Sequence, residues 1–265
     1  MSCTSNDLIV YKYRNWTDQF HKDVLLKNEL FFAPPASLND PYDHLVPMNL
    51  QLLDTDAKRR EYAGSIGKRF IDQLPIEIYQ RKQEQFLFDL ENNLPSLQKR
   101  SDQLESEMYN NHYGVLSLSF NCLSKVMWSQ YSDKHQGYCI GFYENLLQNV
   151  HEQIMGGPIA YSDEYPQVHP LEDLESQVWK KRMRKAKEWE HEAEYRIVRG
   201  FNNPPSDNDR ILVLPPYYIS EVIIGAKACD QTKSEILAVC REKGIRVFQA
   251  RLMPFQYEIS KELLS

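Results

Sequence analysis

The sequence lacks the features that mark several large classes of protein. Neither G-x-G-x-x-G nor G-x-x-x-x-G-K-[ST] occurs, so the phosphate-binding loops of Rossmann and P-loop proteins are missing. The five cysteines include no C-x-x-C pair, which argues against a disulfide framework and a structural zinc site. Also absent are an apolar run near about 18 residues and a basic N-terminal segment followed by an apolar core. We therefore expect a cytoplasmic protein that does not span a membrane.

Excess positive charge is missing as well. The chain has 31 Lys and Arg against 37 Asp and Glu, a formal net charge of −6. Its overall electrostatics therefore give no reason to expect affinity for nucleic acid or a membrane surface. The chain does have 265 residues, of which 42% are hydrophobic, and these can bury a sizeable core. The hydrophobic pattern does not distinguish a dimer face from a core face, so it leaves the oligomeric state open.

The order of the predicted elements indicates a single α+β domain over residues 1–265, with a mixed, largely antiparallel sheet and flanking helices. Runs rich in β-branched and aromatic residues predict strands at residues 8–13, 30–33, 114–120, 137–142, 159–161, 194–199, 211–214, 221–224 and 247–251. Helices are predicted after a cap at Thr17 and at residues 125–131, 171–190 and 232–243. Residues 54–111, broken at Pro75 and Pro95, are predicted to form an insertion of two or three amphipathic helices.

Polar residues near the start of the chain form the first candidate group. Tyr13 ends the first predicted strand and Arg14 follows it, and Asn39 and Asp40 open an Asn-Asp-Pro turn. Asn and Asp side chains can bond backbone amides one or two residues on, so turn formation alone would also explain this pair.

The second candidate group lies in the middle of the chain. Ser117 and Ser119 share one face of a predicted strand. Trp128 and Tyr131, three residues apart on the next predicted helix, also lie on one face. These aromatic residues could bind a ligand, or they could be core residues whose polar tips find backbone partners.

The third group is Lys185 with Glu192, Glu194 and Arg196. A strand beginning near Glu192 would point the two glutamates and the arginine to one face, where burial without pairing would be costly. The row is therefore either a salt-bridged scaffold or a site. Carboxylates held near arginine stay ionised at pH 7, which suits transition-state stabilisation or ribose binding better than general acid catalysis.

The only strongly basic run is residues 180–187, with six cations in eight positions. It could hold the phosphates of a nucleotide or a nucleic acid. A solvated helix face is the alternative, because Glu188, Glu190 and Glu192 follow immediately.

Several of these segments together resemble the bacterial domain of unknown function 2971 family in order and spacing. They are Tyr11-Lys-Tyr, Phe32 to Asp43, Ser117-Leu-Ser-Phe, Met127 to Phe142, and Lys185 to Arg196. The resemblance covers nearly the whole chain except residues 54–111, and it implies an architecture more than a reaction.

A more distant resemblance is to ADP-ribosyltransferase-like folds, in which an early strand, a serine-bearing strand and a late carboxylate strand enclose nicotinamide adenine dinucleotide (NAD). Tyr13 or Arg14, Ser117-Leu-Ser119 and Glu192-Ala-Glu194 match these places. The resemblance implies cleavage of the nicotinamide N-glycosidic bond without a metal. Glu194 would then bond the ribose hydroxyls and stabilise the developing positive charge.

The resemblance also implies roles for the other candidate residues. Tyr131 or Trp128 would stack on the nicotinamide, and Arg14 or Lys185 would contact the pyrophosphate. The predicted catalytic residues are Glu194, Glu192 and Tyr131. The residues predicted to bind NAD as the substrate are Tyr13, Arg14, Asn39, Asp40, Ser117, Ser119, Trp128, Lys185 and Arg196. The acceptor of the transferred group would be a protein or a nucleic acid.

Two other functions fit the same residues. In a metal-dependent nuclease, Asp40, Asp43, Glu192 and Glu194 would bind a divalent cation and residues 180–187 would bind phosphates. In a non-catalytic nucleotide sensor or scaffold, the same residues would form a ligand pocket or a partner interface. The resemblance to the 2971 family leads us to expect a phage-defence or toxin-antitoxin setting.

Overall fold

The computed structural model describes residues 8–43, 46–67, 75–150 and 154–264. Its strands are β1 (Ile9–Arg14), β2 (Glu29–Phe31), β3 (Tyr113–Ser119), β4 (Tyr138–Tyr143), β5 (Ile154–Pro158), β6 (Ala160–Ser162), β7 (Arg184–Ala186), β8 (Glu194–Gly200), β9 (Ile211–Val213), β10 (Ile219–Ile224), β11 (Arg246–Leu252) and β12 (Ile259–Leu263). Its α-helices are α1 (Gln19–Leu26), α2 (Asp56–Gly67), α3 (Ile76–Asn92), α4 (Leu94–His112), α5 (Lys125–Tyr131), α6 (Glu144–Gln148), α7 (Leu174–Arg182) and α8 (Asp230–Lys243). The 3-10 helices are η1 (Pro35–Ser37), η2 (Leu50–Leu52), η3 (Lys187–Glu192) and η4 (Pro216–Tyr218).

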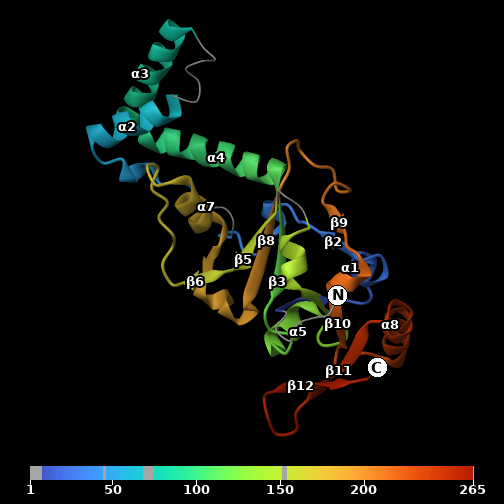
Figure 1. Cartoon of the computed structure of the whole chain (residues 1–265). Helices are drawn as coiled ribbons and strands as arrows, with labels where there is room; N and C mark the ends of the chain where they lie inside the picture. Colours follow the sequence, from blue (N-terminus) through green and yellow to red (C-terminus); the bar gives the residue numbers. More distant parts are fainter. Residues whose placement is uncertain (1–7, 44–45, 68–74, 151–153, 265) are drawn as a thin grey trace.

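A large sheet forms the centre of the molecule, with the order β12-β11-β10-β4-β1-β3-β8-β5 (Figure 1). The pair β10–β11 is parallel, and the other neighbouring pairs are antiparallel. The predicted α+β class with a mixed, largely antiparallel sheet is therefore confirmed.

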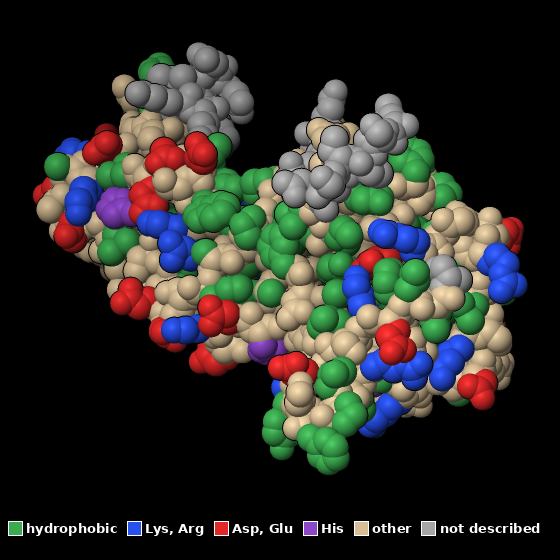
Figure 2. Space-filling model, turned by 60° about the horizontal axis from the view of Figure 1, so that its bottom comes forward, with side chains coloured by type: hydrophobic (Ala, Val, Ile, Leu, Met, Phe, Trp, Pro, Cys, Tyr) green, Lys and Arg blue, Asp and Glu red, His purple; other side chains and the backbone are tan. Residues whose placement is uncertain are grey.

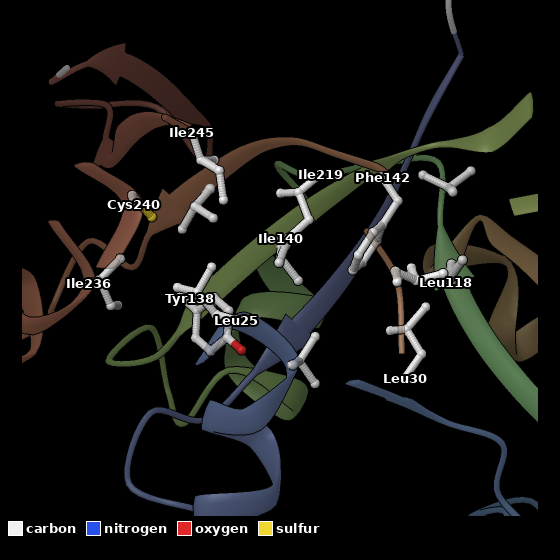
Figure 3. Close-up of a cluster of buried hydrophobic side chains, with 14 of the residues drawn as sticks. Leu25, Leu30, Leu118, Tyr138, Ile140, Phe142, Ile219, Ile236, Cys240 and Ile245 are labelled. Atoms are coloured by element: carbon white, nitrogen blue, oxygen red, sulfur yellow. The ribbon is translucent and has the colours of Figure 1, made fainter. Parts of the chain in front are cut away.

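Helices cover both faces of this sheet. Leu25 of α1 and Ile236 of α8 pack against Tyr138 and Ile140 of β4 in the larger core cluster (Figure 3). Trp128 of α5 belongs to a second cluster, which includes Cys139 and Ile223. Neighbouring residues of a strand point to opposite faces, so α1 and α8 lie on one side of the sheet and α5 lies on the other.

The predicted helical insertion corresponds to α2, α3 and α4, which project from the body (Figure 1). Pro75 is the N-cap of α3 and Pro95 lies in the first turn of α4, a position where the missing N–H of proline costs no helical hydrogen bond. Residues 68–74 of the predicted insertion lie outside the described residues. Tyr62, Leu50 and Leu90 give this arm a small core of its own.

Two predictions about the local structure are wrong. The first helix is capped by Asp18, whose side chain accepts from His21 N, and not by Thr17. The helix predicted at residues 171–190 is α7 followed by β7 and η3, because residues 184–186 pair in parallel with β6. The strand pairing of residues 184–186 with β6 therefore outweighs the helical propensity of this charged segment.

Charged side chains of both signs are interspersed over the face drawn in Figure 2, in keeping with the modest net charge of −6. Among the described helices, none combines the length and the apolar character needed to cross a membrane.

Candidate functional site

A pocket lies where β1 and β3 separate within the large sheet. These strands share one paired position, Tyr11 with Ser119, whereas β1 pairs with β4 at six positions and β3 with β8 at seven. The strands diverge beyond that point, and the gap is lined by eight of the predicted residues: Tyr13, Arg14, Asn39, Ser117, Tyr131, Lys185, Glu192 and Glu194. The pocket measures about 310 Å³, at the lower end of the roughly 300–1,000 Å³ typical of ligand sites.

A buried ionic cluster forms one wall of the pocket. Arg196 donates to Asp43 with Nη1–Oδ1 at 2.8 Å and Nη2–Oδ2 at 2.6 Å, and to Glu194 with Nε–Oε1 at 2.8 Å. Lys185 Nζ lies 2.6 Å from Glu192, 3.3 Å from Glu194 and 3.6 Å from Asp43. All five side chains are buried, so each charge depends on its partners inside the cluster.

The cluster sets the protonation states at this wall. Burial alone would raise the pKa of the Glu194 carboxyl, but Arg196 and Lys185 lower it to about 2. Burial likewise opposes the charge on Lys185, but Glu194 and Asp43 outweigh this and raise its pKa. For Asp43 burial prevails and raises the pKa despite Arg196. Glu194 is therefore an anion at neutral pH and has no proton to donate.

Glu192 reaches the cluster through a turn and not through strand alternation. The strand begins at Glu194, as predicted for residues 194–199, and the alternative start near Glu192 is not met because Glu192 ends η3. Between them Ala193 has φ of 44°, in the left-handed region that non-glycine residues seldom adopt. This turn brings both carboxylates to Lys185, and such local strain is frequent at functional sites.

Tyr131 connects the cluster to the early Asn-Asp-Pro turn. Its hydroxyl donates to Glu192 Oε1 at 2.7 Å and accepts from Asn39 Nδ2 at 2.9 Å. Burial, and after it the hydrogen bond to Glu192, raise the pKa of Tyr131. The hydroxyl is therefore protonated at neutral pH and lies between the turn and a carboxylate, where a ligand hydroxyl could replace Asn39 as its donor.

The opposite wall of the pocket carries Lys12 and Arg14 of β1. Lys12, which was not among the residues predicted from the sequence, donates from Nζ to the carbonyl oxygen of Ser117 across the gap. Neither cation has an ion-pair partner in the part of the chain that the structure describes, and Arg14 Nε is buried without a hydrogen bond. The alternation of Lys12 with the predicted Arg14 within an apolar strand was the signal that could have identified Lys12.

Desolvation makes these two cations receptive to an anion. Burial, and after it the neighbouring guanidinium of Arg14, lower the pKa of Lys12 well below its ordinary value. Burial lowers the pKa of Arg14 to about 10. A bound phosphate or carboxylate would stabilise the charged form of both side chains.

Four of the predicted binding residues do not reach the pocket. Trp128 is fully buried, and its ring contacts Tyr13 edge-on at 5.2 Å and stacks with His135 at 6.3 Å, which leaves no free face for nicotinamide. Ser119 Oγ donates to the Glu192 carbonyl at 2.6 Å. Arg196 lies behind the carboxylates, and Asp40 lines a different cavity.

The basic run at residues 180–187 does not form one phosphate-binding face. Lys180 pairs with Glu172, Lys181 pairs with Glu105, and the guanidinium of Arg182 lies over the ring of Tyr113 at 4.0 Å. The cations of the run are distributed between α7, β7 and η3 and point to different partners.

Comparison with protein-family models bears on the segment from α5 to β8. The model of the family described as "Protein of unknown function (DUF2971)" matches residues 127–197. The predicted resemblance to the 2971 family is thereby confirmed over this segment, which begins in α5 and ends in β8. No curated protein and no solved structure matches the chain. The matched segment carries five lining residues of the pocket: Met127, Tyr131, Lys185, Glu192 and Glu194.

Proposed function

We propose that this protein, which matches the DUF2971 family model over residues 127–197, binds NAD in the pocket between β1 and β3 and cleaves its nicotinamide N-glycosidic bond. One observation supports the proposal most directly: the pocket opposes two cations without ion-pair partners among the described residues, Lys12 and Arg14, to the buried glutamates Glu192 and Glu194. A ligand with both phosphates and ribose hydroxyls matches such a site. The adjacency of β1, β3 and β8 in the sheet adds support, because the resemblance to ADP-ribosyltransferase-like folds places NAD among these three strands.

In this proposal the cationic and the acidic residues of the pocket bind different parts of NAD. Lys12 and Arg14 bind the pyrophosphate, while Tyr131 and Glu192 bind the ribose hydroxyls. Glu194, held ionised by Arg196, stabilises the positive charge that develops on the ribose as the bond breaks. A preorganised electrostatic interaction of this kind contributes about 2.7–4 kcal/mol to the transition state.

The absence of a proton on Glu194 agrees with this reaction. The ring nitrogen of nicotinamide is cationic in NAD, so the electron pair of the breaking C1′–N bond neutralises it and the leaving group needs no general acid. The new bond forms between C1′ and the acceptor atom. This atom is the oxygen of water, or an oxygen or nitrogen of a protein or nucleic acid, and the acceptor loses a proton to solvent.

Release of nicotinamide from NAD by the purified protein tests the proposal, with cell lysate added to supply acceptors. We expect Glu192→Gln and Glu194→Gln to lower the rate by roughly a hundred- to a thousandfold. Glu190→Gln is the matched control because Glu190 is an exposed carboxylate of the same 3-10 helix, η3. Circular dichroism spectra of all variants check folding. Intact NAD after incubation with the wild-type protein and lysate would reject the reaction.

Binding without turnover is a second candidate function, favoured by one observation. Both carboxylate oxygens of Glu194 already accept hydrogen bonds from Arg196, and the residue is only 2% exposed. A carboxylate so fully engaged suits a sensor that recognises a nucleotide. Thermal stabilisation by NAD that is lost in Lys12→Met, with no nicotinamide released, would favour this function.

The geometry does not favour a metal-dependent nuclease. Asp43, Glu192 and Glu194 converge on the ammonium group of Lys185, which would repel a divalent cation entering the same space. Asp40 lies in another cavity, so the four carboxylates do not form one ligand set.

A further inference from the structure

A second cavity, of about 220 Å³, adjoins the ionic cluster on the side of β6 and β7. It shares Asp43 and Lys185 with the first pocket. The turn at residues 40–43, the segment after β6 and strand β7 enclose it. Its volume lies below the roughly 300–1,000 Å³ of drug-sized sites, so it suits a group the size of one side chain.

The charges of this cavity are unbalanced. Its described lining contains five carboxylates and two cations, a formal excess of three negative charges. The carboxylates are those of Asp40, Asp43, Asp163, Glu164 and Glu188, and the cations are Arg184 and Lys185. Outside the lining, Arg196 pairs with Asp43 and Lys187 pairs with Asp163. Lys185 is already shared among three carboxylates of the cluster, so Asp40, Glu164 and Glu188 are left with Arg184 as the one further cation of the described lining.

Asp40 is a buried carboxylate in the lining of this cavity. It is 6% exposed, its Oδ1 accepts from the backbone N–H of Tyr42 at 2.9 Å, and no cation lies within ion-pair distance of it among the residues that the structure describes. A buried carboxylate without a counter-ion is costly. A cationic ligand would supply the missing charge.

Two tyrosines beside Asp40 indicate what kind of cation fits. The rings of Tyr42 and Tyr165 meet edge-on at 6.4 Å, and they are 70% and 47% exposed. Exposed aromatic faces next to carboxylates attract planar, delocalised cations. Arg184 and Lys185 in the same wall oppose a compact divalent ion, whereas a guanidinium group can spread its five N–H donors over separate carboxylates.

We propose that this cavity binds a guanidinium group, either free or as an arginine side chain, with Asp40 as its buried counter-ion and Tyr42 and Tyr165 as its aromatic contacts. The inference does not depend on the nucleotide reaction, because it rests on the second cavity alone. The motif Asn39-Asp40 thus serves two sites: Asn39 contacts Tyr131 in the first pocket, and Asp40 faces the second.

Isothermal titration calorimetry on the full chain tests this site with two probes, methylguanidinium and Nα-acetyl-arginine amide. Saturable binding of either supports the proposal, and tighter binding of the amide identifies an arginine side chain as the source. We expect Nα-acetyl-citrulline amide, which has similar shape and no charge, to bind at least tenfold more weakly than the arginine amide.

Two variants localise the binding. Asp40→Asn keeps an acceptor for Tyr42 N–H but removes the charge, and we expect at least a tenfold loss of affinity for the arginine amide. Tyr165→Leu changes an exposed side chain and should weaken binding severalfold, so it tests the site even if Asp40→Asn is unstable. The matched control is Asp230→Asn, an exposed aspartate at the start of α8, which should bind as the wild type does.

Three results would overturn the proposal. They are no saturable binding of either probe, equal binding of the citrulline amide, and unchanged affinity in both cavity variants. Magnesium or calcium that binds with an Asp40-dependent affinity, while neither guanidinium probe binds, would show a metal site in place of an organic cation site.

Discussion

Arg196 is fully buried, and its guanidinium contacts two carboxylates, Asp43 and Glu194. Removal of this one cation would leave both anions inside the protein with Lys185 alone. Breaking a buried ion pair from one side costs about 3–5 kcal/mol, so we expect Arg196→Met to lower the free energy of unfolding by about that amount. Urea unfolding followed by circular dichroism measures it.

Arg251→Met is the control for this prediction. Arg251 pairs with Glu262 at 3.0 Å, but both side chains are more than half exposed. Exposed pairs contribute about 0–1 kcal/mol, so the control should unfold nearly as the wild type does. Equal losses in the two variants would show that the buried cluster is not a stabilising unit.

The low pKa of Glu194 makes stability depend on pH in a defined window. Its value of about 2 lies below the ordinary 4.5, so its contribution is fully present above pH 4.5 and disappears as the pH falls through about 2. The shift corresponds to about 3 kcal/mol. We expect the difference in unfolding free energy between wild type and Glu194→Gln to shrink as the pH is lowered from 4.5 towards 2. A constant difference over this window would contradict the assigned pairing.

The sequence allowed some residues of the site to be predicted and not others. Glu192, Glu194, Lys185 and Tyr131 were predicted because charged and aromatic residues are dense around them. Trp128 has the same local signal but is a core residue, since only the packing of α5 on the sheet decides which ring faces inward.

At the scale of elements, helix α1 shows how one hydrogen bond locates a boundary. Asp18 accepts from His21 N at 2.9 Å, the geometry of an N-cap, while the Thr17 hydroxyl donates to Asn15. Loss of a cap costs about 1 kcal/mol. We expect Asp18→Ala to lower the thermal unfolding midpoint and Thr17→Ala to lower it less, as measured by differential scanning calorimetry. The reverse order would place the cap at Thr17.

The secondary structure between α7 and β8 departs most from the sequence-based prediction. Residues 174–182 are helical as their pattern indicates, with Asp173 as the cap. Beyond Met183 the chain pairs with β6, and Ala193 then turns it into β8. Neither the pairing nor the turn has a local sequence signal, because alanine is a common helix former and rarely adopts a left-handed backbone.

At the scale of the whole molecule, the pocket exists because the sheet divides. The strands from β12 to β1 stay paired on one side, and β3, β8 and β5 stay paired on the other. The projecting arm is joined to the body near the site, where Lys181 of α7 pairs with Glu105 of α4 and Arg182 bonds Tyr109.

The sequence by itself determined the α+β class, the positions of most strands and the helical character of the arm, and it singled out Lys185, Glu192 and Glu194, which line the pocket. Those properties follow from local periodicity and turn chemistry, which depend on neighbouring residues. Only the tertiary structure decided that β1 and β3 separate, that Lys12 belongs to the pocket, and that Asn39 and Asp40 face different cavities. These facts depend on contacts between residues distant in the chain. The local sequence does not specify which neighbouring strands separate or which side chains surround a buried charge.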